Sequence, residues 1–362
     1  MSSFMDSLTK FESLCEYLQY ESNKHSNEFT WYINEGKERV SSKNVVQIVN
    51  KQLRQSLQKQ AQTNIKTLNK NIKNIQANIE ETINRQQTRE EGVVNRRQSV
   101  LHNLEEQLNK ALVNRDKLEN IDKYLQGDNP HHSSSFPEIP DKFENKFIAL
   151  VERSCGHGWE WLVLLVLVRK LKAKDFSERI IDFSKEAIPL DVKRGSEPLY
   201  LYYRPKTSVP LLQIDNKKQK SLKSKPDFIL TKSAQSPYTS TRNANSIDTI
   251  IECKSTNFRS KDFFKFWGQA RGLKASTAIL LCFQEHVPTS DADYQKERII
   301  PIFQEDVPNK SQQPTTDDYI FLDITDDGLH ISAMRTITPI KDRLRFECTP
   351  WITAFVQQLD LT

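Results

Sequence analysis

The chain has 362 residues, which is long enough for two domains or for one domain with a large extension. It carries a formal charge of +5, and this mildly basic balance permits a polyanionic partner without requiring one. Its five cysteines form no CxxC pair, which argues against a zinc site or a disulfide framework.

No membrane-targeting segment is expected. The first residues lack the basic and then apolar pattern of a signal peptide. The longest apolar stretch, from Trp161 to Val168, is far shorter than the ~20 residues that span a bilayer. We therefore expect a cytoplasmic protein that does not contact a membrane.

Residues 1–126 are predicted to form a helical or coiled-coil arm. Between residues 42 and 126, apolar side chains recur every three or four positions, as on one stripe of a helix. Gly92 interrupts this pattern, so we expect two long helices in an antiparallel hairpin, with one unbroken helix as the alternative. The stripe must be buried against the return helix or another protomer, which predicts a homo-oligomer or a partner protein at the arm.

Residues 127–142 are rich in turn-forming residues and are predicted to be a linker. The remaining residues, 143–362, alternate between helical and strand patterns, which indicates an α/β fold with a mixed sheet flanked by helices. Helices are expected at 141–154, 159–172, 261–273 and 351–359, with Gly156-His157-Gly158 separating the first two. Strands are expected at 199–203, 225–230, 249–254, 277–283, 319–323, 329–332 and 343–346.

Two of these strands carry acidic residues. Asp227 lies on the strand at 225–230, and Glu252 lies with Lys254 on one face of the strand at 249–254, since side chains alternate along a strand. If the two strands pair, both carboxylates lie at one edge of the sheet. Their mutual repulsion is relieved by a hard cation such as Mg²⁺. The alternative is that Asp227 caps a turn while Glu252 and Lys254 form a surface pair.

The Pro226-Asp227 and Glu252-x-Lys254 motifs, followed by a helix and an apolar strand, resemble the PD-(D/E)xK nuclease superfamily and its restriction-endonuclease-like fold. The resemblance covers roughly residues 143–283. It implies that Asp227 and Glu252 bind Mg²⁺, or Mn²⁺, with the backbone carbonyl of Cys253 as a further ligand. It also implies that Lys254 serves the attacking water.

Two accessory catalytic positions follow from the same resemblance. Many members carry a glutamate on the first core helix, where Glu160 fits best and Glu144 and Glu152 compete. Some members carry a glutamine with a tyrosine four residues later. Gln269 matches the glutamine here, but Leu273 stands at the tyrosine position.

Basic residues flank the two motifs and are expected to contact nucleic acid. They are Lys217, Lys218, Lys220, Lys223 and Lys225 before Asp227, and Arg259 and Lys261 after Lys254. The resemblance implies a metal-dependent endonuclease, acting on DNA and serving restriction or anti-phage defence. The alternative is a catalytically inactive adaptor that binds nucleic acid and docks a partner through its helical arm.

Overall fold

We describe the protein from a computed structural model. The structure describes residues 3–25, 28–33, 38–86, 94–127, 135–171, 180–182, 187–194, 196–204, 207–210, 221–224, 226–232, 247–254, 277–283, 319–325, 328–333 and 336–340. The chain divides into two compact units, one made of Met1–Glu12 and Val49–Ser154 and the other of Ser13–Ile48 and Cys155–Thr362. The expected linker at 127–142 lies inside the first unit, so this division does not coincide with the expected domain limits.

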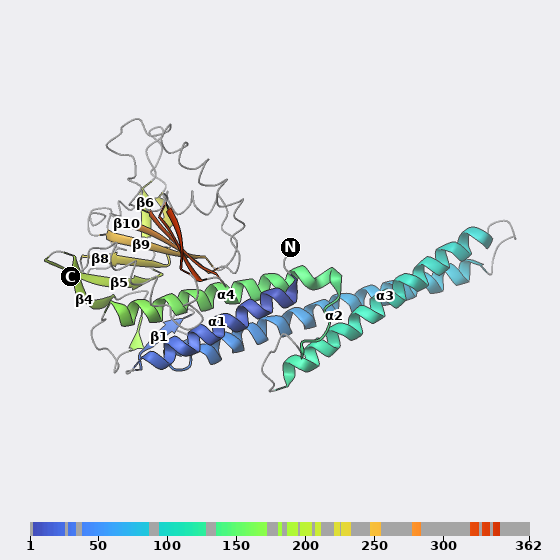
Figure 1. The fold of residues 1–362 in the computed structure, drawn as a ribbon. Helices are drawn as coiled ribbons and strands as arrows, with labels where there is room; N and C mark the ends of the chain where they lie inside the picture. The colour runs from blue at the N-terminus through green and yellow to red at the C-terminus, as the bar shows by residue number, and fades with distance from the viewer. Residues whose placement is uncertain are drawn as a thin grey trace, which may run out of the picture. The chain divides into compact units, whose positions relative to one another are not determined.

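Long helices form most of the first unit. The described helices are α1 (Phe4–Lys24), α2 (Val45–Gln86), α3 (Val94–Gln126) and α4 (Asp141–Lys170). Figure 1 shows α2 and α3 side by side, and the Gln62 amide donates a hydrogen bond to Asp122 across the pair. Leu68 and Leu118, from the two predicted apolar series, are both buried within this single chain. The prediction of two helices in an antiparallel hairpin is therefore confirmed.

Helix α4 is continuous, so the predicted break at Gly156-His157-Gly158 is wrong. A Cβ atom added to Gly158 would lie 2.8 Å from Cδ2 of Leu14 on α1. The glycine therefore allows α1 and α4 to pack closely. This packing offsets the roughly 1 kcal/mol that a glycine costs inside a helix. From Trp159 to Leu167 every side chain is buried.

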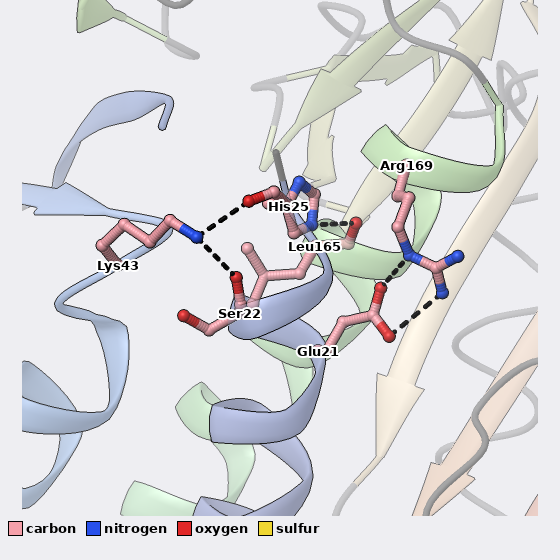
Figure 2. A network of polar contacts seen from close by, with 6 residues as sticks. All are labelled: Glu21, Ser22, His25, Lys43, Leu165 and Arg169. Carbon is pink, nitrogen blue, oxygen red and sulfur yellow. Dashed lines mark hydrogen bonds and ion pairs between the residues drawn. The ribbon is translucent and has the colours of Figure 1, made fainter. Parts of the chain in front are cut away.

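A network of polar contacts holds the end of α1 against α4 in the second unit (Figure 2). Glu21 is fully buried and pairs with Arg169, with Nε–Oε1 and Nη2–Oε2 distances of 2.5 and 3.1 Å. Nε2 of His25 donates to the Leu165 carbonyl at 3.0 Å. The Lys43 ammonium donates to the carbonyls of Ser22 and His25, which satisfies backbone acceptors at the C-terminus of α1.

Among the described residues, the second unit contains an eight-stranded mixed sheet, so the α/β class is confirmed. The strand order is β13-β12-β11-β10-β9-β8-β5-β4. Strand β10 is parallel to both β9 and β11, and the other neighbours are antiparallel. The strands are β4 (Ile188–Arg194), β5 (Glu197–Tyr203), β8 (Phe228–Thr231), β9 (Ile247–Lys254), β10 (Thr277–Phe283), β11 (Tyr319–Thr325), β12 (Gly328–Ala333) and β13 (Thr336–Ile340).

Six of these strands lie where the sequence predicted them, whereas β4 and β13 were not predicted. A small sheet of β1 (Thr30–Ile33), β2 (Glu38–Ser41) and β3 (Ile180–Ile181) was also missed, because strands of two to four residues show no recognisable periodicity. The strand predicted at 343–346 and the helices predicted at 261–273 and 351–359 lie outside the described residues.

Strands β6 (Thr207–Pro210) and β7 (Ser221–Ser224) form an antiparallel ribbon between β5 and β8 in the sequence. Tyr203 pairs with Phe228 at the end of the β5–β8 ladder, and Thr207 pairs with Ser224 at the start of the β6–β7 ladder. The two ladders therefore have the same pairing register. In this register Arg204 and Asp227, which lie between the ladders, are opposite each other.

None of the described helices contains an apolar stretch long enough to cross a bilayer.

Candidate active site

Asp227, directly before β8, and Glu252, on the neighbouring strand β9, lie at matching positions. The β8–β9 ladder pairs Phe228 with Ile251, and the next step in this antiparallel register places Asp227 opposite Glu252. Oδ2 of Asp227 accepts a hydrogen bond of 2.7 Å from the backbone N–H of Cys253. The two acidic residues predicted to share one sheet edge therefore meet across adjacent strands.

Glu252 is almost completely buried. Its exposed fraction is 4%, and every side chain described on β9, from Ile247 to Cys253, is buried. A buried carboxylate is costly unless a cation or hydrogen-bond donors compensate its charge. Glu252 is therefore poorly explained as part of a surface pair, the alternative considered from the sequence.

Glu160 reaches the same region from α4, but its carboxylate is engaged by other side chains. Oε2 of Glu160 accepts from the Tyr203 hydroxyl at 3.1 Å and from Nε of Arg204 at 2.6 Å. Oε1 accepts from Nη2 of Arg204 at 2.7 Å. Glu160 thus forms a two-point ion pair with Arg204, an interaction that the sequence analysis did not predict.

Arg204 links Glu160 to Asp227. Its backbone N–H donates to the Asp227 carbonyl at 2.6 Å, while its guanidinium reaches Glu160. Arg204 has a φ of 47°, in the left-handed region that costs a non-glycine residue roughly 1–2 kcal/mol. The sequence signal that could have identified it is a basic residue directly after the buried strand β5.

Charge and burial fix the protonation of Tyr203 and Arg204. Burial, reinforced by the negative charge of Glu160, raises the pKa of Tyr203 well above its usual range, so its hydroxyl stays a neutral donor. Burial alone would lower the pKa of Arg204, but the hydrogen bond to Glu160 and the negative charges of Glu160 and Asp227 outweigh this effect and raise it. Arg204 therefore remains a permanent cation beside the acidic residues.

The other predicted catalytic residues are described in part or not at all. Lys254 ends β9, where its backbone pairs with Cys282 of β10, but its amine lies outside what the structure describes. Gln269 lies outside the described residues. Glu144, one of the competitors of Glu160, accepts from the N–H of Phe4 at 3.0 Å and so caps the start of α1.

Of the residues predicted to contact nucleic acid, the structure describes only one. Lys223 lies on β7, with its backbone paired to Ser208 of β6. The remaining basic positions lie outside the described residues, namely Lys217, Lys218, Lys220, Lys225, Arg259 and Lys261.

The donor atoms present suit a hard divalent cation only in part. The carboxylates of Asp227 and Glu252 and the carbonyl of Cys253 are oxygen ligands of the kind that Mg²⁺ prefers. Glu160 does not add a third carboxylate, because Arg204 occupies it. In the part of the chain that the structure describes, no three His, Cys, Asp or Glu side chains are grouped to hold a metal ion.

The chain was also compared with known proteins. No family model matches it, and it has no significant match among curated proteins or solved structures.

Proposed function

We propose that this chain is a metal-dependent nuclease of the PD-(D/E)xK type, with a restriction-endonuclease-like core in its second unit. The observation that carries the proposal is the position of Asp227 beside Glu252 across the β8–β9 pair, with Lys254 two residues further along β9. The order of strands and the antiparallel pairing of β8 with β9 support it.

In this proposal, Asp227 and Glu252 hold Mg²⁺ or Mn²⁺, together with the Cys253 carbonyl. The ion, when bound, supplies charge stabilisation for the phosphodiester and lowers the pKa of an attacking water. Lys254 orients that water by a hydrogen bond from its ammonium. The hydrogen bond from the Cys253 N–H fixes the orientation of the Asp227 carboxylate before any ligand arrives.

The proposed substrate is DNA. Phosphates would be held by the basic residues on both sides of the acidic pair, including Lys223 on β7. A role in restriction or anti-phage defence remains part of this proposal. The α2–α3 hairpin is the proposed contact for a second copy or a partner protein, and it carries the exposed apolar side chains Val100 and Val113 on α3.

A second candidate is a nucleic-acid-binding adaptor without catalysis. The pairing of Glu160 with Arg204 favours it, because this interaction removes one carboxylate from the set available to a metal. The adaptor would still bind nucleic acid through the basic residues.

Cleavage of plasmid and linear DNA with Mg²⁺ or Mn²⁺ tests the two candidates. The nuclease proposal expects cutting by the wild type and loss of cutting in Asp227→Asn and Lys254→Ala. Matched controls are Asp191→Asn and Lys193→Ala, which change exposed residues on β4 of the same sheet and should keep activity. Undiminished cutting by D227N or K254A contradicts the proposed mechanism. A wild type that retards DNA in a gel without cutting it favours the adaptor.

A further inference from the structure

Arg204 occupies the junction of the elements that carry the proposed site. It follows β5, its backbone pairs with the residue before β8, and its side chain reaches Glu160 on α4. We propose that Arg204 is a phosphate-binding residue and that Glu160 acts as its positioning residue rather than as a metal ligand. The inference rests on the proposed function for the identity of the polyanion as DNA.

The geometry leaves part of the guanidinium available to a ligand. The pair with Glu160 uses Nε and Nη2, so Nη1 takes no part in those two hydrogen bonds. The side chain of Arg204 is 47% exposed, whereas that of Glu160 is 11% exposed. A buried carboxylate therefore holds one edge of a cation that still reaches solvent. Arginine recognises phosphate through this planar set of donors.

The second buried pair of α4 provides an internal comparison. Arg169 also binds a buried glutamate, Glu21, at two points, but the Arg169 side chain is only 23% exposed. That arginine completes the packing between α1 and α4. Arg204 has twice the exposure and sits on a left-handed backbone, a conformation found mostly where the surrounding structure imposes it for function.

Electrostatics add the reason for this placement. The carboxylates of Asp227, directly before β8, and of Glu252, in β9, would repel a phosphodiester unless positive charge lies nearby. The backbone N–H of Arg204 donates to the backbone carbonyl of Asp227, so the residue that bears this fixed positive charge adjoins the acidic pair. Glu160 restricts the side chain of Arg204 to one orientation, which lowers the entropy lost when a phosphate binds.

Binding of a short fluorescein-labelled DNA duplex in EDTA tests the inference without cleavage. Anisotropy is measured over a series of salt concentrations for wild type, Arg204→Gln, Arg204→Lys, Glu160→Gln and the E160Q/R204Q double variant. R204Q should weaken binding roughly tenfold and lower the salt slope by about one, as loss of one phosphate contact requires. R204K should restore the slope, and E160Q should weaken binding less than R204Q.

The double variant guards against misfolding, because two neutral amides of similar size replace the charged pair. It should bind as R204Q does, since Glu160 acts only through Arg204. The matched control E21Q/R169Q, which neutralises the other α4 pair, should bind as wild type. Wild-type affinity and salt slope in the folded double variant would overturn the inference, as would a wild type that does not bind the duplex.

A separate measurement assigns the role of Glu160. Mn²⁺ binding followed by electron paramagnetic resonance should be equal in wild type and E160Q, and lost in D227N. Loss of Mn²⁺ binding in E160Q would make Glu160 a ligand and overturn its positioning role. If wild type binds DNA through Arg204 but never cuts it, the nuclease proposal fails while this inference stands.

Discussion

Oδ2 of Asp227 lies 2.7 Å from the backbone nitrogen of Cys253, so a side chain from the start of β8 completes a hydrogen bond on β9. We predict that Asp227→Ala lowers the free energy of unfolding by about 1–3 kcal/mol, because the buried N–H loses this acceptor. Asp227→Asn keeps an oxygen acceptor and should remain near wild-type stability. Urea unfolding measures the stability of both variants, and Asp191→Ala, at an exposed position of β4, is the control. Equal stability of D227A and D227N would contradict this account.

Gly158 makes the contact between α1 and α4 sensitive to a single methyl group. Gly158→Ala should destabilise the protein by about 1–3 kcal/mol, because the new Cβ would clash with Leu14. The cost of this clash should exceed the gain in helix propensity. Thermal unfolding is the measurement. Gly156→Ala, in the same helix, is the matched control and should be neutral or stabilising. A Leu14→Ala background should remove most of the penalty of G158A, and an unchanged penalty there would show that the clash is elsewhere.

His25 should make stability depend on pH. Burial lowers its pKa, opposed by Glu21 and by the bond to the Leu165 carbonyl and reinforced by the charges of Arg169 and Lys43. The unfolded chain therefore takes up a proton near pH 6.5 before the folded protein does, and stability falls as the pH drops below about 6.5. Urea midpoints across that range should fall more steeply in wild type than in His25→Gln. Parallel profiles would exclude His25 as the cause.

The Glu21–Arg169 pair should be costly to break from one side. Arg169→Ala leaves the fully buried Glu21 carboxylate uncompensated, which predicts a loss of about 3–5 kcal/mol in the free energy of unfolding. The double variant E21Q/R169Q should lose much less, because no buried charge remains. Lys110→Ala breaks the exposed Lys110–Glu106 pair and should have no measurable effect. Equal losses in R169A and the double variant would indicate that packing, not charge, dominates.

The sequence was informative where local pattern alone determines structure. The apolar, β-branched runs that became β8 and β9 identify buried strands, because strands covered on both faces read as continuous hydrophobic segments. The juxtaposition of Asp227 and Glu252 followed from assuming that two such strands pair. Strand β4 was missed although Ile188, Leu190 and Val192 alternate as buried positions, and its Pro189 is tolerated because β4 is the edge strand.

Features that depend on contacts between distant segments could not be read from the sequence. Gly158 looks like a helix break until Leu14 is known to lie against it. The sequence places Glu160 on an apolar helix, but its partner Arg204 is 44 residues away and is positioned by the pairing of β5 with β8. Short-range patterns carry no information about which side chain neutralises a buried charge.

The shared register of the β5–β8 and β6–β7 ladders has a consequence for how this chain can change. Removing or adding residues in opposed pairs along the ribbon would alter its length while Arg204 stays opposite Asp227. An unpaired insertion in one strand alone would instead offset the register of the ribbon from that of the β5–β8 ladder by one position and turn the ribbon's side chains to the other face. The outer part of the ribbon can therefore be redesigned as a module, provided that the two strands are edited together.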